Sequence, residues 1–167
     1  GLAAGYEKMA ECFEYGRGTV FDIIRAVELY HTALTKKDGL AGYRLAEIYR
    51  TGRGGISPDL PLAEATYQEA GELGWLPAYA ALADMYMNEP GFTDYRKAFA
   101  CAQYGAENGD PACMTVLAKM YNTGTGTEKN RVEALKWTAK ASALRTGGKI
   151  SEVIQPDNTA DIREDLP

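Results

Sequence analysis

Large apolar and aromatic residues recur along the chain in one short pattern. A Leu or Met is followed directly by Ala, and an aromatic residue stands four positions after the Leu or Met. The pattern occurs as MAECFEYGRG (9–18), LAEIYRTGRG (45–54), LADMYMNEPG (82–91) and LAKMYNTGTG (117–126). Successive copies begin 36, 37 and 35 residues apart. Positions i, i+1 and i+4 share one side of a helix, and a period of this length indicates an array of helical repeats.

Each copy of the pattern ends with a signal that stops a helix. A glycine stands three residues after the aromatic residue in three of the copies, at Gly16, Gly52 and Gly124. Glycine is the favoured helix stop because it enters the left-handed conformation without a Cβ clash. In the third copy Pro90 is expected to end the helix, since proline blocks its continuation.

A second helix is predicted after each of these loops. Its expected N-cap is an Asp or Asn four residues before an alanine, namely Asp22, Asp59, Asp94 and Asn130. Such side chains accept hydrogen bonds from the free amides of the first helical turn. Glu133 also stands at the capping-box position relative to Asn130. Each copy therefore encodes a helical hairpin.

The sequence predicts an all-α fold. A single hairpin cannot bury its apolar stripe, so we expect a right-handed α/α superhelical solenoid of four antiparallel helix hairpins with about 36 residues per repeat. The alanines of the pattern allow helices to approach closely. The aromatic residues, which are Phe13, Tyr49, Tyr86 and Tyr121, are expected to fill the space between neighbouring hairpins.

The predicted repeats cover most of the chain. Their expected boundaries are 1–36, 37–73, 74–108 and 109–148. The remaining segment, 149–167, lacks the pattern and is expected to be a cap and a partly mobile tail. Within it, Ile150, Val153 and Ile154 are expected to cover the open end of the last hairpin.

Composition and charge exclude several classes of protein. Hydrophobic residues make up 46% of the chain, which excludes disorder as a whole. The balance of 18 basic against 23 acidic residues gives a net charge of −5, the wrong sign for binding nucleic acid or anionic membrane. No apolar run is long enough to span a bilayer. The chain does not begin with Met, so we expect a trimmed N-terminus; periplasmic, secreted and cytoplasmic locations all stay open.

The complete pattern resembles a known repeat. It reads G-x-x-x-A-x-x-x-L-A-x-x-Y-x-x-G-x-G, then a loop, then D-x-x-x-A-x-x-W/Y-x-x-x-A-x-x-x-G, and is similar to the Sel-one-like repeat (SLR), a branch of the tetratricopeptide-like α/α superhelices. The resemblance covers residues 1–147 and departs from the family at Met9, at Cys113 and at the missing glycine of the third copy. It implies a non-enzymatic adaptor or scaffold. Bacterial members of the family are often exported or act in signalling, envelope and secretion pathways.

Analogy with tetratricopeptide-like arrays places the first helix of each hairpin along a concave groove. Side chains two residues before, two after and five after the Leu or Met are then expected to face a partner. The candidate partner-binding residues are Glu7, Glu11, Glu14, Tyr43, Glu47, Arg50, Asp84, Met87, Lys119 and Asn122. They predict an acidic, tyrosine-containing groove for a basic or mixed-charge peptide. The alternative is an ordinary solvated helix face.

The sequence contains little that indicates catalysis or cofactor binding. Arg17 and Arg53 stand between glycines, but neither loop has the spacing of a phosphate-binding loop. The favoured interpretation is that these arginines contact an acidic partner at the rim of the groove. His31 is the only histidine and is expected to be exposed. Carboxylates such as Glu7 and Glu11 are explained by a solvated helix face, with a hidden carboxylate dyad as the disfavoured alternative. We expect no catalytic residue, no metal and no cofactor.

The three cysteines are Cys12, Cys101 and Cys113. Some exported SLR proteins bridge their hairpins with disulfides, and Cys101 and Cys113 are separated by one helix turnaround, which permits a bridge. Both replace small or medium-sized core residues, so buried free thiols are the favoured interpretation.

We therefore expect a non-enzymatic scaffold or adaptor that binds a protein or peptide. Neither nucleic acid nor direct membrane insertion is expected. The alternatives are a bacterial secretion-linked inhibitor or immunity-type protein, and an exported cell-envelope or host-interaction factor.

Overall fold

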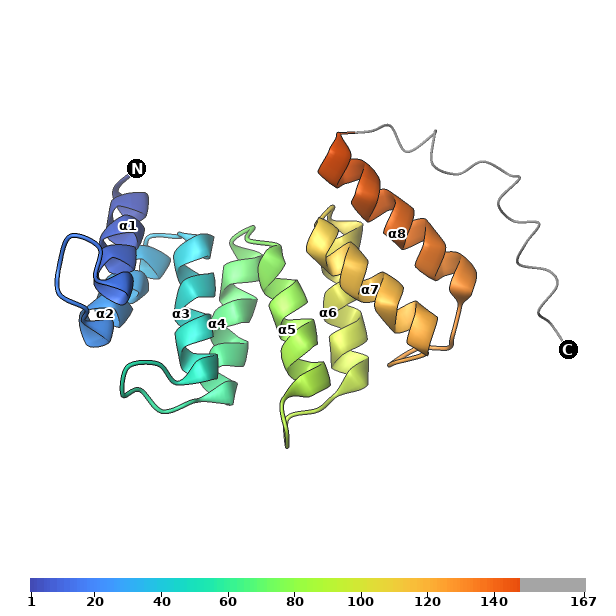
Figure 1. The fold of residues 1–167 in the computed structure, drawn as a ribbon, viewed down its shortest axis with the longest axis horizontal. Helices are drawn as coiled ribbons and strands as arrows, with labels where there is room; N and C mark the ends of the chain where they lie inside the picture. Colours follow the sequence, from blue (N-terminus) through green and yellow to red (C-terminus); the bar gives the residue numbers. More distant parts are fainter. Residues whose placement is uncertain (148–167) are drawn as a thin grey trace, which may run out of the picture.

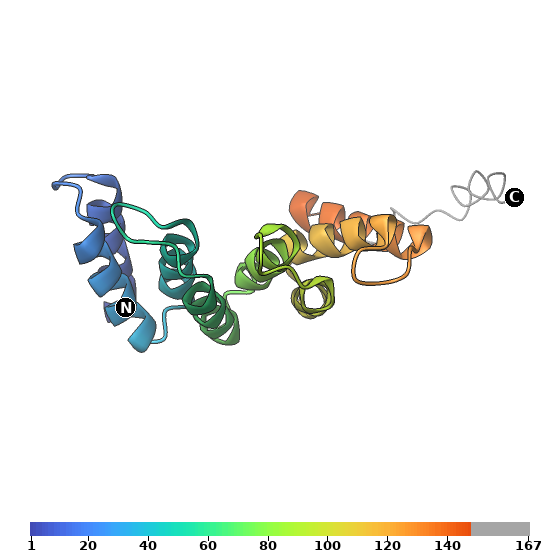
Figure 2. The same cartoon turned by 90° about the horizontal axis from the view of Figure 1, so that it is seen from below.

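The computed structural model describes residues 1–147, and within this range every regular element is a helix (Figure 1). The eight helices are α1 (Leu2–Tyr15), α2 (Ile23–Thr35), α3 (Gly39–Thr51), α4 (Leu60–Glu72), α5 (Pro77–Asn88), α6 (Tyr95–Glu107), α7 (Pro111–Thr123) and α8 (Arg131–Thr146). Each helix packs on its neighbours in sequence, and α5 also contacts α7. Figures 1 and 2 show the resulting row of hairpins, which begins with α1 and α2 and ends with α7 and α8. The predicted all-α solenoid of four hairpins is confirmed.

The first helix of each hairpin stops where the sequence predicts. Gly16, Gly52 and Gly124 adopt left-handed conformations with φ of 64°, 66° and 75°. Helix α5 ends differently, because Glu89 is already extended and Pro90 follows it. Both endings agree with the prediction.

All four predicted N-caps of the second helices are confirmed. The side chains of Asp22, Asp59, Asp94 and Asn130 accept hydrogen bonds from amides of the following turn. The amide of each cap residue also donates to the carbonyl oxygen of the aromatic residue in the preceding helix, at 2.7–3.0 Å. Because the Asn130 amide donates to Tyr121, it does not need Glu133, which pairs with Lys136 instead. Only half of the predicted capping box is formed.

The starts of the first helices were not predicted. Asp38 and Asp110 cap α3 and α7 through their side chains, and Pro77 opens α5. The amide of each cap also donates to a carbonyl of the preceding helix, from Asp38 to Ala33 and from Asp110 to Gly105. These short turns join successive hairpins through the same kind of amide-to-carbonyl hydrogen bond that the longer loops use within one hairpin.

The core lies between the helices and is rich in alanine. The pattern alanines and the alanines of the second helices are buried, namely Ala10, Ala46, Ala83, Ala118, Ala26, Ala63, Ala98 and Ala134. Tyr30, Tyr67 and Leu45 are the largest of the side chains that are buried completely. The predicted spacer aromatics are packed less uniformly, since Tyr86 is buried while Phe13, Tyr49 and Tyr121 are half-buried.

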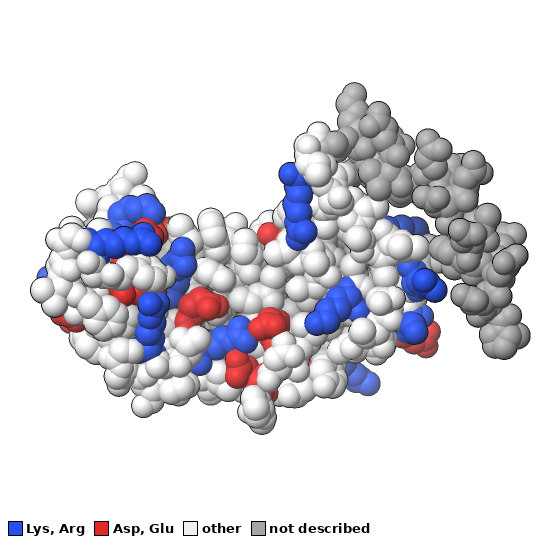
Figure 3. Space-filling model, viewed as in Figure 1, with Lys and Arg blue, Asp and Glu red and all other residues white. Residues whose placement is uncertain are grey.

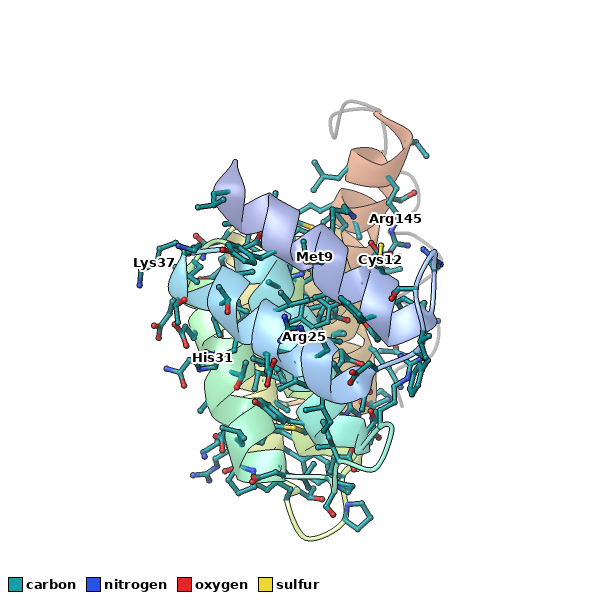
Figure 4. The ribbon with its side chains drawn as sticks, turned by 90° about the vertical axis from the view of Figure 1, so that its left-hand side faces the viewer. Met9, Cys12, Arg25, His31, Lys37 and Arg145 are labelled. Carbon is teal, nitrogen blue, oxygen red and sulfur yellow. The ribbon has the colours of Figure 1, made fainter. Side chains whose placement is uncertain are left out.

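Met9 departs from the expected core stripe. Its equivalents Leu45, Leu82 and Leu117 are buried, but Met9 is 51% exposed. Helices α3, α5 and α7 are each covered by the second helix of the hairpin before them. Figure 4 looks onto the α1 end of the row, where no described helix lies in front of Met9 and Cys12. The expected caps at the opposite end, Ile150, Val153 and Ile154, lie outside the described residues.

Candidate protein-interaction surface

Helices α1, α3, α5 and α7 present equivalent positions on one side of the solenoid. Next to the buried pattern alanines lies a column of variable polar residues, made of Glu11, Glu47, Asp84 and Lys119. We call this column, together with Tyr43, Arg50, Met87 and Asn122, the first-helix face. Its members are half-buried on α1, α3 and α5, whereas Lys119 and Asn122 on α7 are exposed. The pattern positions build the scaffold, and the positions beside them differ from one repeat to the next.

Two predicted groove residues do not belong to this face. Glu7 is only 3% exposed and Glu14 only 4%. Glu14 accepts a hydrogen bond from the Tyr30 hydroxyl at 2.6 Å and one from Arg53 Nη1, also at 2.6 Å. The expectation that both carboxylates are free for a partner is therefore wrong. The reason is that α1 packs on α2 and also contacts α3, so the two glutamates face protein rather than solvent.

The loop arginines act inside the molecule. Arg53 reaches from the second hairpin to Glu14 of the first, and its guanidinium also lies over the Tyr15 ring, 5.0 Å from the ring centroid. Arg17 lies over the same ring at 5.0 Å and contacts Glu11 at 3.2 Å. Each arginine thus already has a carboxylate and an aromatic partner, which weakens the suggestion that these loops bind an external acid.

The carboxylates of the first-helix face are also engaged. Glu11 is paired with Lys8 at 3.1 Å, and the hydrogen bond from Lys8 lowers the pKa of Glu11. Glu47 accepts a hydrogen bond from the Tyr67 hydroxyl. Burial is the main cause that raises the pKa of Tyr67, and this hydrogen bond adds to it. The Tyr43 ring packs against Tyr67 and is held in place.

Arg50 joins the second and third hairpins. Its Nη2 contacts Asp84 and its Nε contacts Glu89, both at 2.7 Å, and its side chain is 16% exposed. Asn88 donates to the other oxygen of Asp84. Figure 3 shows acidic and basic side chains intermixed over the region of α3 and α5. This part of the face is a network of paired charges and not the freely acidic strip that the sequence suggested.

The α7 end of the face has a different character. Helix α7 contains no Asp or Glu, and Lys119 forms no ion pair within residues 1–147. Figure 3 shows blue without red over the middle of this helix. Beside Lys119 lies a pocket of about 420 Å³, lined in part by Met87, Tyr95 and Thr125.

A second pocket lies between the first two hairpins. It has a volume of about 210 Å³ and is lined by Glu14, Tyr15, Tyr43, Arg44, Glu47, Ile48, Thr51 and Arg53. The Nε atom of Arg44 is buried and has no hydrogen-bond partner among the described residues. The Glu14–Arg53 pair occupies one side of this pocket.

The sequence did not reveal the tyrosine–glutamate pairs. Besides the pairs of Tyr30 and Tyr67, the Tyr86 hydroxyl donates to Glu64, which also contacts Lys97 at 3.3 Å. One available signal is that tyrosine stands eight residues after the cap in both α2 and α4 while glutamate stands on the first helices. That signal does not say which glutamate and tyrosine meet.

The residues considered for catalysis and metal binding also have defined positions within residues 1–147. Residues 1–147 contain no group of three His, Cys, Asp or Glu side chains arranged to hold a metal ion. His31 is exposed, as expected. All three cysteines are free; Cys113 is buried, and burial raises the pKa of Cys101 to about 11.

None of the helices in this part of the chain has the length and apolar character needed to cross a bilayer.

Comparison with known proteins identifies the repeat. The family model described as Sel1 repeat matches residues 3–38, 40–75, 76–110 and 111–145. The chitin synthase regulator SKT5 of Saccharomyces cerevisiae is 32% identical over 120 residues, which are 70% of this chain and 17% of that protein. The DAP3-binding cell death enhancer 1 of Rattus norvegicus is 33% identical over 145 residues, which are 84% of this chain and 28% of that protein. The chain therefore spans less than a third of either relative.

A solved structure shows the same architecture. The crystal structure of a Sel1 repeat protein from Oxalobacter formigenes superposes with a TM-score of 0.75 at 26% identity, over 87% of this chain and 59% of that chain.

Proposed function

The chain belongs to the Sel1 repeat family, and from this premise we propose that it is a scaffold that binds a mixed-charge segment of a partner protein along the first-helix face. Sel1 repeat proteins generally mediate protein–protein interactions and are generally not enzymes. The names of the two curated relatives describe a regulator of another protein and a protein that binds DAP3. Both names are consistent with a role in binding.

One observation carries the choice of surface. The column of Glu11, Glu47, Asp84 and Lys119 changes from acid to base while the alanines beside it stay constant and buried. In a solenoid, each repeat contributes one such position to an extended binding surface. Positions that vary without disturbing the core are the ones available for recognition.

The paired charges support a mixed-charge partner and not a uniformly basic one. Glu11, Asp84 and Glu89 each have a cationic neighbour in the chain. Complementary charges along an interface orient a partner more than they strengthen its binding. A segment with both signs of charge matches a face on which acidic and basic side chains both occur.

The test is a selection of peptides from a displayed random library on the purified chain, followed by binding measurements on variants. Ala80 occupies the position on α5 that Tyr43 occupies on α3, and Ala80→Arg with Asn122→Arg on α7 adds two bulky cations to the first-helix face. The matched control, Ala65→Arg with Ala100→Arg, places two on exposed positions of the second helices. We expect the face variant to lose selected peptides by about tenfold or more in affinity and the control to keep them.

The proposal fails if the two double variants behave alike, or if the face variant binds as the parent does. Circular dichroism of both variants checks that each keeps its helices.

A further inference from the structure

We infer that the junction between the third and fourth hairpins is a docking pocket for a partner segment that carries a carboxylate beside a large apolar side chain. The inference rests on the proposed function and names the chemistry of one part of the same face. It follows from comparing equivalent positions at the three junctions between hairpins.

The first two junctions are closed by charges from the chain itself. At the first junction Glu14 of α1 pairs with Arg53 from the next hairpin at 2.6 Å. At the second junction the equivalent of Glu14 is Arg50, which pairs with Asp84 and Glu89 of the next hairpin. In both cases the residue five positions after the Leu or Met is charged and finds its partner across the junction.

The third junction has no such pair. The position of Glu14 and Arg50 is occupied by Met87, and the position of Arg53 by Thr125. The position of Glu47 is occupied by Lys119, so the sign of the charge in the central column is reversed. Lys119 is exposed and forms no ion pair within the described part of the chain.

The pockets at the first and third junctions are built from equivalent residues. Glu14, Glu47, Ile48, Thr51 and Arg53 line the first, and their counterparts line the other: Met87, Lys119, Met120, Thr123 and Thr125. The first pocket measures about 210 Å³ and the third about 420 Å³. The larger pocket is the one in which Met and Thr stand at the positions of the charged pair. It also leaves an apolar side chain beside an unpaired cation.

The shape and chemistry of the larger pocket define its occupant. Met87 and the half-exposed Tyr95 ring offer contact to a large apolar side chain. Lys119 at the same pocket offers a charge-assisted hydrogen bond to a carboxylate. Thr123 and Thr125, whose hydroxyls lie 2.7 Å apart, add polar groups beside it. A segment with Asp or Glu next to Leu, Met or Phe meets both requirements, whereas a basic segment meets a like charge.

The peptides selected for the proposed function supply the probe. We expect the selected peptides that bind in this pocket to be enriched in Asp or Glu adjacent to a large apolar residue. Lys119→Glu should weaken their binding about tenfold, because it replaces attraction by repulsion. Their binding should also weaken at high salt, since the contact is partly exposed. The matched control is Lys36→Glu, which makes the same charge change at an exposed position after α2.

Each outcome separates the two proposals. Peptides that need the first-helix face but bind equally to the Lys119→Glu variant, or that are enriched in Lys and Arg, overturn the docking pocket and leave the scaffold proposal standing. Equal losses from Lys119→Glu and Lys36→Glu show a net-charge effect and also overturn it. If no selected peptide is lost by the face variant, the scaffold proposal itself fails.

Discussion

The last glycine of the pattern has different surroundings in the first and the last hairpin, although its backbone is left-handed in both. Gly18 has φ of 75° and an added Cβ there would meet no atom within 4 Å. Gly126 has φ of 71°, but an added Cβ would overlap the carbonyl oxygen of Tyr95 in the preceding hairpin. The loop of the last hairpin thus rests directly on the start of α6.

This difference leads to a prediction with a built-in control. We expect Gly18→Ala to lower the free energy of unfolding by about 1 kcal/mol, the cost of a Cβ in a left-handed backbone. Gly126→Ala should cost about 2 kcal/mol more, because the backbone must move to relieve the overlap. Urea denaturation of both variants measures the two values. Equal losses would show that Gly126 is kept only for its backbone conformation.

The cysteines give a second prediction at the residue scale. Titration in denaturant without reducing agent should find three free thiols, as the structure shows. In the folded protein at pH 8, Cys12 should react first, because it lies on the uncovered side of α1. Burial raises the pKa of Cys101 to about 11, which leaves about 0.1% of it as thiolate at pH 8. Burial raises the pKa of Cys113 as well.

Mass spectrometry of partly labelled protein identifies the residue that reacts first. The Cys12→Ser variant should lose the fast phase. A titration that finds fewer than three thiols, or a fast phase that survives in this variant, would contradict the assignment.

Element boundaries were the most predictable part of the fold, since each has a local cause. Asp59 was predicted as an N-cap from its spacing to Ala63, and its Oδ1 accepts from the Leu62 amide at 2.9 Å. Asp38 and Asp110 were missed because they follow short turns and not the conspicuous glycine loops. The same cap chemistry operates there without the pattern that drew attention to the others.

The cap of α4 can be tested directly. Asp59→Ala should lower the free energy of unfolding by about 1 kcal/mol, because the first turn loses an acceptor. Asp59→Asn keeps an acceptor and should lower the free energy of unfolding by only about 0.3 kcal/mol. Thermal unfolding followed by circular dichroism compares them. A loss of the same size in both variants would point to the charge and not to the cap.

The stabilisation that an ion pair provides depends on how far its side chains are buried. Arg50 links the second and third hairpins through Asp84 and Glu89, with a guanidinium that is mostly shielded. Arg25 pairs with Glu28 at 3.0 Å within α2, and both side chains are more than half exposed. We expect Arg50→Ala to cost about 1–2 kcal/mol and Arg25→Ala less than about 0.5 kcal/mol.

Arg50→Met separates charge from packing, because it keeps an apolar stem without the guanidinium. Denaturation in urea at low and high salt provides the readout. If Arg25→Ala is as damaging as Arg50→Ala, the bridge between hairpins has no special weight.

At the scale of the molecule, the sequence predicted the stack but not the pairing of its charges. The buried alanines follow from the pattern within one hairpin, and the stack follows from the repetition of that pattern along the chain. The burial of Glu14 depends on Tyr30 and Arg53, which come from two other elements. The exposure of Met9 likewise depends on what lies beside α1 and not on its own helix. Contacts of this kind arise only when hairpins are placed against each other.

Tyrosines buried against carboxylates make the whole molecule sensitive to alkaline pH. Burial is the main cause that raises the pKa of Tyr30 and Tyr67 above the ordinary 10.0, and hydrogen bonds to Glu14 and Glu47 add to it. Above pH 10 the unfolded chain releases these protons while the folded chain retains them. The stabilising contribution is therefore complete below pH 10 and is lost as the pH rises beyond it. Each tyrosine contributes a loss of up to about 1.4 kcal/mol per pH unit in that range.

We expect the midpoint of urea denaturation to fall between pH 9 and pH 11. Tyr67→Phe removes one titrating group, so this variant should be less stable than the parent at pH 9 but lose less stability on going to pH 11. Tyr95→Phe, at a half-exposed ring, is the matched control and should keep the pH dependence of the parent. An unchanged midpoint in the parent, or the same decrease in the parent and in Tyr67→Phe, would show that the buried tyrosines do not govern alkaline stability. A smaller decrease in Tyr67→Phe alone would identify the Tyr67–Glu47 contact as one that couples protonation to the packing of the second hairpin.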